Sequence, residues 1–335
     1  MSAERAPAAE ADAAETPFVL ARARVASVER MSPTFARIAF AGLELHAIGT
    51  PGRVFDQRIK LVFPAPGRPL PELTSDGDWW EQWLAVPEEA RGSMRTYSIR
   101  ALEAGADATR LVVDFVLHLA EDASGPASRW AGSAAVGDEI LLVGPRRGRT
   151  DGGGIEYDPG DAARVLLAGD ETAAPAIARI LEDADRGLRG AALIEVPREA
   201  DALPVDAPPG VALYWLPRGD ADVGSALIPA VLGHLGAPAA ARAVVDRSSR
   251  GGRTTVRDGA PGDGEDLVWE TPAYSGLGEQ LADEPSPVGG DRYVWIAGES
   301  GVVTSLRRHL VKDLGLPRRR VAFMGYWRRG VAMRG

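Results

Sequence analysis

The sequence changes its hydrophobic pattern at a glycine-rich stretch, TDGGGIEYDPGD, at residues 150–161. Before this stretch apolar residues recur at every second position, as in strands that bury one face. After it, short apolar runs alternate with segments whose apolar residues recur at helical spacing, as in a parallel sheet covered by helices. We therefore predict a β domain at residues 17–150, a linker at 151–162 and an α/β domain at 163–335.

The first domain is predicted to be an antiparallel six-stranded Greek-key β-barrel. Its expected strands lie in residues 18–41, 54–63, 95–100, 110–119 and 139–145, and several short strands with turn residues between them are typical of a barrel. One helix interrupts them, in SGPASRWAGSA at 124–134. Its Gly-Pro start leaves backbone amides accessible, which makes this helix start a candidate anion site.

The second domain is predicted to be a doubly wound parallel sheet. Two of its expected strands end in similar tails, LLAGDET and WIAGES, and in such sheets ligands bind beyond the carboxyl ends of the strands. The sequence has no G-x-G-x-x-G motif, so either a nucleotide site or two tight strand–helix turns would explain the tails. Arg218, after the strand LYWLP, is either a ligand for a 2′-phosphate or a surface residue.

Composition excludes several classes of function. The chain has no cysteine, so it has no disulfides, thiolate metal sites or cysteine nucleophile, and its four histidines are not at metal-ligand spacing. A net charge of -9 argues against nucleic-acid binding. No apolar run approaches the roughly 18 residues of a membrane span. Residues 1–16 have no apolar core for a signal peptide and are expected to be a disordered lead to a cytoplasmic protein; the polar stretch 246–266 is expected to be a mobile loop.

Several strings of the sequence together resemble one family. RTYSIR, VDFVLHLAEDASGPASRWA and GDEILLVGPRRG in the first half, with LLAGDETAAPAIARILE, YVWIAGES and GYWRRG in the second, are similar to ferredoxin reductase-like flavoproteins. Within these, they resemble the siderophore-interacting protein family, whose members are FAD-containing ferric-siderophore reductases. The resemblance runs from about residue 18 to the C-terminus. The acidic insert LAEDASG and the loop at 246–266 depart from the family pattern.

The resemblance implies a role for each residue of RTYSIR. Arg95 would hold the FAD pyrophosphate, because a guanidinium suits the geometry of phosphate. Tyr97 would lie against the isoalloxazine, and Ser98 would contact its N5 edge. His118 would touch the flavin or be an ordinary core or surface histidine. The other cofactor-binding residues on this side would be Thr96, Gly125, Ala127 and Ser128.

The resemblance also implies a nicotinamide side. Asp170, Glu171 and Thr172 would line it, and Gly298 and Glu299 would form its second turn. Tyr326 and Trp327 would lie near the flavin edge. Trp327 would exchange places with the nicotinamide ring, although a core role for it is also open, and Ser98 and Trp327 are the expected catalytic residues.

The expected function is that of a monomeric reductase that uses FAD and NADPH or NADH to reduce a ferric siderophore and release iron. An anionic substrate would need a basic entrance in so acidic a protein, and we expect Lys60, Arg146 and Arg328 to supply it. Two alternatives are open. One is a flavin reductase that passes electrons to a quinone or a protein, and the other is a siderophore-binding protein without catalysis.

Overall fold

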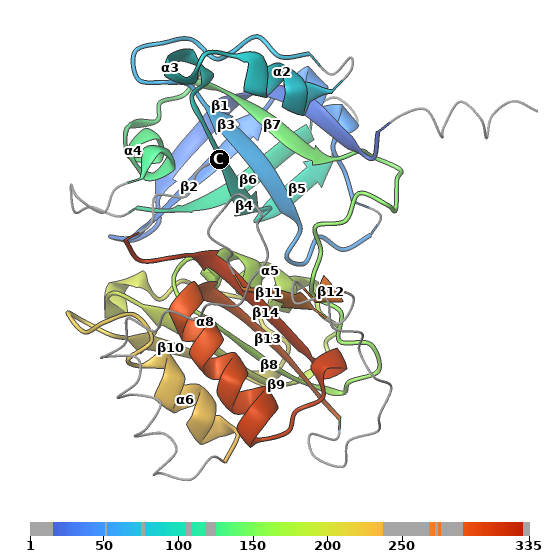
Figure 1. Ribbon diagram of the computed structural model, residues 1–335, viewed down its shortest axis with the longest axis vertical. Helices are drawn as coiled ribbons and strands as arrows, with labels where there is room; N and C mark the ends of the chain where they lie inside the picture. The colour runs from blue at the N-terminus through green and yellow to red at the C-terminus, as the bar shows by residue number, and fades with distance from the viewer. Residues whose placement is uncertain are drawn as a thin grey trace, which may run out of the picture.

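The computed structural model describes residues 16–50, 52–74, 78–104, 109–117, 125–236, 268–271, 274–275 and 291–330. These residues form two sheets, one above the other along the longest axis of the molecule (Figure 1). Three sequence predictions fall outside the described residues: the disordered lead up to residue 15, His118 with most of the insert after it, and the mobile loop at 246–266.

The upper sheet is antiparallel and curls around its own apolar core (Figure 1). Alternate residues of each strand face this core, for example Ile59, Leu61 and Phe63. The strand order is β4-β3-β7-β1-β2-β6-β5. The strands are β1 (Phe18–Arg30), β2 (Phe35–Ala41), β3 (Arg58–Phe63), β4 (Ser93–Ser98), β5 (Ala101–Ala104), β6 (Thr109–Val116) and β7 (Glu139–Pro145).

This sheet differs from the closed six-stranded barrel expected from the sequence. It has seven strands, and in the described part of the chain its end strands β4 and β5 do not pair with each other. The reason lies at the end of RTYSIR. The amide of Ile99 donates to the carbonyl of Gln57, whereas the amide of Arg100 donates to that of Val112. The chain therefore changes its pairing partner from β3 to β6 at this point, and a separate short strand, β5, begins.

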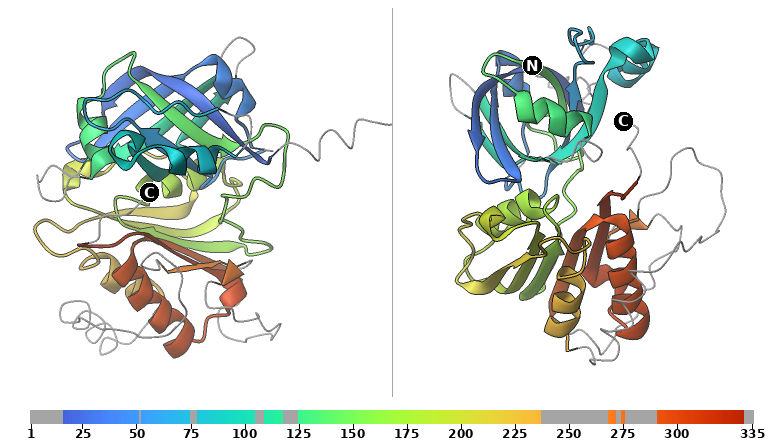
Figure 2. Two further views of the ribbon diagram at one scale, coloured as in Figure 1. Left: turned by 45° about the horizontal axis from the view of Figure 1, so that its top comes forward. Right: turned by 90° about the vertical axis from the view of Figure 1, so that its left-hand side faces the viewer.

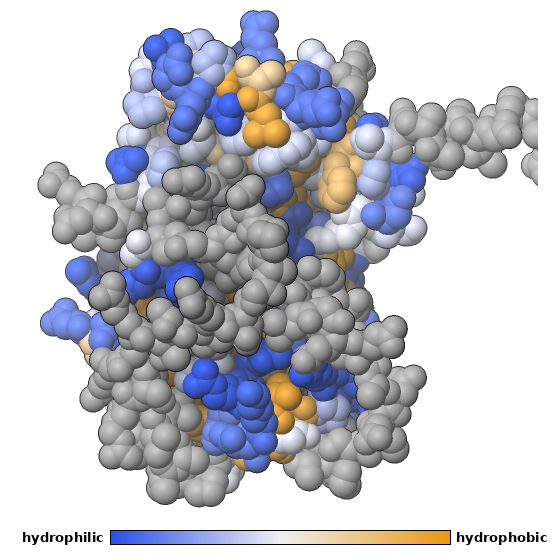
Figure 3. Space-filling model, in the orientation of Figure 1, coloured by the Kyte–Doolittle hydropathy of each residue, from blue (hydrophilic) through white to orange (hydrophobic). Residues whose placement is uncertain are grey.

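Short helices surround the upper sheet. The Trp-rich insertion forms α2 (Trp79–Ala85) and α3 (Glu88–Arg91), and a 3-10 turn spans Leu43–Ala47. Trp83 packs with Val62 and Met94 on the outer face of the sheet. Trp80 and Leu84 are exposed, and Figure 3 shows only a small apolar spot over this insertion, among hydrophilic residues. The Trp cluster is thus mainly a packing feature.

The lower sheet is parallel in its main part, in the order β10-β9-β8-β13-β14-β11-β12. Strand β11 pairs antiparallel with β14 and so ends the parallel arrangement. The fully apolar runs of the sequence form the inner strands, because helices cover both faces. The strands are β8 (Arg164–Gly169), β9 (Arg189–Val196), β10 (Gly210–Pro217), β11 (Trp269–Thr271), β12 (Tyr274–Ser275), β13 (Arg292–Glu299) and β14 (Val321–Trp327).

Helix α5 (Ala174–Asp183) covers the face of the lower sheet that is turned towards the upper sheet, and α6 (Leu227–His234) and α8 (Ser300–Arg307) cover the other face (Figure 2). Val302, Leu306 and Leu310 recur at helical spacing and pack there. The helix widens after Arg307, where a π-helical segment spans Arg308–Asp313. Among the described residues, none of the helices is both long and apolar enough to cross a membrane.

Carboxylates at the junction join the two sheets. Asp201, after β9, is fully buried and accepts hydrogen bonds from the amide and hydroxyl of Thr34 at 2.9 Å and from Ser32 Oγ at 2.7 Å. Asp56, before β3, is also buried and accepts from the amide of Tyr157 and from the indole N–H of Trp295, each at 3.1 Å. Burial raises the pKa of Asp56 to about 6. These contacts fix the edge of one sheet against the other.

Candidate active site

Arg95 is a half-buried cation on the edge strand β4. Its guanidinium donates to the carbonyl of Met94 at 2.6 Å, and no carboxylate among the described residues pairs with it. Burial lowers the pKa of Arg95. By contrast, the buried Arg100 has a bidentate partner in Glu182. A partly desolvated arginine without an acidic partner costs free energy unless an anion binds to it, so Arg95 is a candidate anion ligand.

Tyr97, two residues further along β4, faces the same side as Arg95. Its ring lies 4.6 Å from the ring of Phe115 and 6.4 Å from that of Phe63, measured between centroids. Trp130, from α4 (Pro126–Ser133), closes the group at 5.0 Å from Phe63. Burial raises the pKa of Tyr97, so its phenol stays neutral. The group forms an aromatic wall beside the candidate anion ligand.

Helix α4 begins close to this wall and packs against β4. Gly125 precedes it, Pro126 occupies its first turn, and no described side chain caps it. The small residues Ala127 and Ser128 are buried beneath the first turn. A side chain at Gly125 would meet no described atom within 4 Å, so the described part of the chain does not cover the helix start. The positive end of the helix therefore adds to the favourable environment for an anion.

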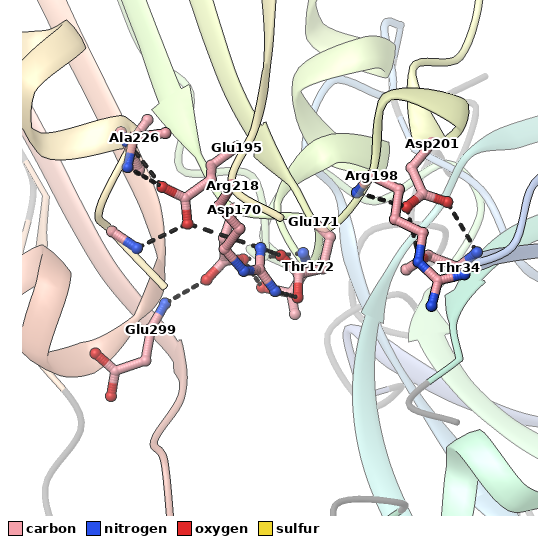
Figure 4. Close-up of polar contacts among 12 residues, drawn as sticks. Thr34, Asp170, Glu171, Thr172, Glu195, Arg198, Asp201, Arg218, Ala226 and Glu299 are labelled. Carbon is pink, nitrogen blue, oxygen red and sulfur yellow. Dashed lines mark hydrogen bonds and ion pairs between the residues drawn. The ribbon is translucent and has the colours of Figure 1, made fainter. Parts of the chain in front are cut away.

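Asp170 is the central carboxylate at the carboxyl edge of the lower sheet (Figure 4). It is buried and accepts four hydrogen bonds: from the amide and hydroxyl of Thr172, the amide of Glu299 and the indole of Trp327, at 2.5–2.9 Å. Gly298 fits against it because a Cβ there would lie 2.6 Å from Asp170 Oδ2. Burial and the neighbouring Glu171 raise the pKa of Asp170 to about 7.

Arg218 lies between two further buried carboxylates (Figure 4). It makes a bidentate pair with Glu171, at 2.6 and 2.8 Å, and lies 3.7 Å from Glu195. Glu195 in turn accepts from three amides at the start of α6, those of Gly224, Ala226 and Leu227. The expectation that Arg218 is a surface residue is therefore wrong: its side chain is 10% exposed. The positive charge of its guanidinium compensates the negative charge of Glu171 and Glu195.

Strand β14 ends at the junction between the sheets with two aromatic residues. Tyr326 stacks on Trp269 of β11, with ring centroids 6.2 Å apart, and the guanidinium of Arg58 of β3 lies over the Trp269 ring, 4.2 Å from its centroid. The buried hydroxyl of Tyr326 has no hydrogen-bond partner among the described residues. Trp327 is half-buried, and its indole is directed to Asp170. A buried phenol without a described partner, beside a half-buried indole, makes this junction a candidate ligand site.

Comparisons with known proteins identify the family. Residues 24–149 match the siderophore-interacting FAD-binding domain, and residues 162–330 match the siderophore-interacting protein model. The chain belongs to the siderophore-interacting protein family. A solved structure of a siderophore utilization protein from T. fusca is 27% identical, has a TM-score of 0.65 and covers 95% of each chain.

Two further comparisons show proteins that share the fold or part of the sequence. A ferredoxin NADP+ reductase from Neisseria gonorrhoeae, solved with FAD and NADP, is 13% identical, has a TM-score of 0.52 and covers 93% of this chain and 100% of that one. It shares the fold alone. The NADPH-dependent ferric-chelate reductase of Escherichia coli is 35% identical over 160 residues, which are 47% of this chain and 54% of that protein. In the curated relatives with the most significant similarity, the aligned segment covers 64% or less of the relative's own length.

The predicted basic residues lie on different elements of this siderophore-interacting protein. Lys60 is exposed on β3, opposite Thr96 of β4, and points away from the core as predicted. Arg328 is exposed after β14. Arg146 follows β7, where its Nε donates to the carbonyl of Thr16 at 3.0 Å. Its guanidinium is therefore bound to the start of the first strand.

The structure brings the predicted residues into two groups rather than one. Arg95 and Tyr97 lie on one face of β4, whereas Thr96 and Ser98 share the opposite face with Lys60 and Arg58. Asp170, Thr172, Glu299 and Trp327 form the second group, at the end of the lower sheet. Sequence reasoning missed Trp130, Arg58 and Trp269. The sequence signal that could have identified Trp130 is its position one turn into a helix that begins with Gly-Pro.

Proposed function

We propose that this protein is a cytoplasmic ferric-siderophore reductase that binds FAD on β4 and α4 and takes electrons from NADPH or NADH. The observation that carries the proposal is Arg95: a half-buried guanidinium without a described acidic partner, beside an aromatic wall and a helix start. This arrangement lies in the segment that matches an FAD-binding domain.

The residues present fit a dinucleotide cofactor. Arg95 and the start of α4 would hold a pyrophosphate, since both offer donors to phosphoryl oxygens. Tyr97 offers a flat, neutral ring for stacking, whereas Thr96 and Ser98 lie on the opposite face of β4. Bound FAD would accept a hydride from a nicotinamide and pass single electrons to ferric iron.

The lower sheet supplies the nicotinamide side. Asp170 holds the Trp327 indole by a 2.9 Å hydrogen bond, so the ring has one defined position from which a nicotinamide would displace it. Glu299 and Thr172 fix the same carboxylate from their backbone amides. Because Arg218 forms a bidentate pair with Glu171 and lies 3.7 Å from Glu195, we assign it a structural role and not that of a 2′-phosphate ligand.

The substrate would be a ferric chelate. One nicotinamide hydride carries two electrons, so it reduces two ferric ions to ferrous ions, which chelate oxygens hold less tightly. Many such chelates are anionic, and a net charge of -9 would repel them. Lys60 and Arg328, which are both exposed, would attract the substrate, together with Arg146.

Stopped-flow spectroscopy tests this function. The purified protein is expected to be yellow, to bleach when mixed with NADPH or NADH, and to regain its colour when a ferric siderophore is added under anaerobic conditions. Ferrous iron is trapped with a coloured chelator to show that two ions are reduced per nicotinamide.

Three results would contradict the proposal. Colourless protein that binds ferric siderophore would indicate a binding protein without catalysis. Yellow protein that bleaches but is reoxidised by quinones and not by ferric chelates would indicate another reductase. Yellow protein that neither nicotinamide bleaches would exclude the proposed electron donor.

A further inference from the structure

A second cluster of cations lies at the amino edge of the lower sheet, opposite the proposed nicotinamide side. The first residues of three neighbouring strands are Arg292 in β13, Arg164 in β8 and Arg189 in β9. The register pairs Arg292 with Arg164, and Arg164 with Arg189. With strands about 4.8 Å apart, three arginines therefore stand side by side in one row.

The three side chains share one face of the sheet. Residues two positions further along each strand are Leu166, Ala191 and Val294, and all three pack into the core beneath α6 and α8. Because side chains two apart in a strand point to the same face, the arginines face the same side. His234, the last residue of α6, completes the group.

These residues line a cavity of about 300 Å³ together with Gly190 and Gly210. The backbone requires both glycines: a Cβ at Gly210 would lie 2.7 Å from the carbonyl of Leu188, and Gly190 has φ +138°. Burial and the charge of Arg292 lower the pKa of His234, so its ring is neutral at pH 7 and can both donate and accept. The cavity thus combines three guanidinium groups with a neutral donor.

The row has little charge compensation among the described residues. None of the three arginines forms an ion pair or a side-chain hydrogen bond there, whereas Arg186 and Arg320 in the same domain pair with Asp206 and Asp161. The nearest acid in sequence, Asp291, accepts from the amide of Ala163. The C-terminal end of α6 contributes only about half a negative charge. Like charges directly opposite on neighbouring strands repel, and among the described residues the three guanidinium groups are set against the carboxylate of Asp291, so the described part of the site keeps a net positive charge.

We propose that this row is a binding site for a compact oligoanion that carries two or more phosphoryl groups. A guanidinium binds phosphoryl oxygens through two parallel N–H donors. A row of three spans about 10 Å from end to end at the spacing of strands. Such a span exceeds what one phosphate bridges and suits a chain of phosphoryl groups, free or at the end of a nucleotide. The site is separate from the proposed reaction and does not depend on it.

The test is calorimetric titration of the FAD-loaded full chain with inorganic pyrophosphate, and in parallel with ATP, at low ionic strength. The variant Arg164→Gln/Arg189→Gln/Arg292→Gln is expected to bind pyrophosphate at least tenfold more weakly than the parent. Arg308→Gln, which removes an exposed charge on the same domain, is expected to bind as the parent does. If the triple variant loses affinity for ATP and for pyrophosphate by the same factor, the phosphoryl chain is what the site recognises.

Melting without ligand gives a second measurement. Since the substitutions relieve repulsion between the arginines, the unliganded triple variant is expected to melt at the same temperature as the parent or higher. The melting temperature of the single variant Arg189→Gln is expected to lie between those two. A parent that binds no pyrophosphate, or a triple variant that binds it as tightly, would overturn the proposal. So would a lower melting temperature in both Arg189→Gln and the triple variant, because the arginines would then have structural partners.

Discussion

At the scale of single residues, this protein separates its buried charges into paired and unpaired ones. Arg100 and Arg218 each have a bidentate carboxylate partner. Arg95 has no such partner among the described residues, and the carboxyl of Asp170 is held by hydrogen bonds and not by a bidentate arginine. Unpaired buried charges are costly in a fold, and both of these lie where we propose that a cofactor binds.

Arg95→Ala is expected to purify with little FAD. The loss of a charge-assisted contact to phosphate costs about 2–3 kcal/mol, which is roughly a 30- to 150-fold loss of affinity. The measurement is the ratio of flavin to protein absorbance after dialysis. Arg68→Ala, at an exposed position of the same domain, is the control and should keep its flavin. A fully flavinated Arg95→Ala would show that this residue does not hold the cofactor.

Asp170→Asn is expected to change how stability depends on pH. The pKa of Asp170 is raised in the folded state to about 7 from 3.8, so the folded protein holds a proton that the unfolded chain releases. Stability of the parent therefore falls as pH rises through this interval and levels off above about 7. Asparagine does not titrate. The variant should gain about 2–3 kcal/mol relative to the parent between pH 5 and pH 7.

Urea denaturation of both proteins at several pH values measures this difference. If the stability of parent and variant changed with pH in parallel, Asp170 would be ionised at every pH tested. Its four hydrogen-bond donors would then stabilise the carboxylate more than burial destabilises it.

At the scale of elements, the turn at the end of β13 sets the position of Trp327 at the end of β14. Gly298 has φ +142°, and its missing side chain leaves room for the Asp170 carboxylate. That carboxylate then holds Trp327 at the end of β14. A turn between a strand and a helix thus sets the position of an aromatic ring on a neighbouring strand.

Gly298→Ala is expected to destabilise the protein by about 1–3 kcal/mol, because the new Cβ would require both an unfavourable φ and displacement of Asp170. Gly132→Ala is the matched control. It lies inside α4 with no atom within 4 Å of the added Cβ, so it should stabilise by about 0.5–1 kcal/mol. Thermal melts with tryptophan fluorescence report both effects. Equal melting temperatures for the two variants would contradict the account of this turn.

At the scale of the whole molecule, polar contacts hold the two sheets in one arrangement. Asp201 reaches from the lower sheet to the turn at Ser32 and Thr34, and Asp56 reaches from the upper sheet to Trp295. Phe55, next to Asp56, has φ +46°, and Asp183 of α5 accepts its amide at 2.9 Å. Because these contacts are buried and numerous, we expect both halves to unfold together.

Asp201→Ala is expected to destabilise the molecule by about 2–4 kcal/mol, since it removes the carboxylate that accepts from the buried hydroxyls of Ser32 and Thr34. It should also split a single unfolding transition into two, as the halves become independent. Differential scanning calorimetry measures both effects. Asp206→Ala, at an exposed residue paired with Arg186, should melt as the parent does. A single, unshifted transition in Asp201→Ala would show that other contacts suffice to join the halves.

The sequence alone determined the class of each half. Period-two alternation in VFDQRIKLVF predicts a strand with Ile59 and Leu61 inside and Lys60 outside, and the structure has this arrangement. Likewise the apolar runs RVLLAG and RYVWIAG form the inner strands β8 and β13. Such patterns are readable because burial of one face repeats with the period of the backbone. RTYSIR and GYWRRG were also readable, since the resemblance rests on short, contiguous strings.

Only the tertiary structure decided which charges meet. Arg218 and Glu171 are 47 residues apart and form a buried pair, and Trp327 meets Asp170 across 157 residues. The extra strand β5 likewise depends on whether Arg100 pairs with β3 or with β6. Partners so far apart in the chain leave no periodic signal, because their contact depends on how two sheets pack and not on local backbone geometry. The row formed by Arg164, Arg189 and Arg292 exists for the same reason: strand register, set by burial of neighbouring apolar residues, aligns three arginines that the sequence separates.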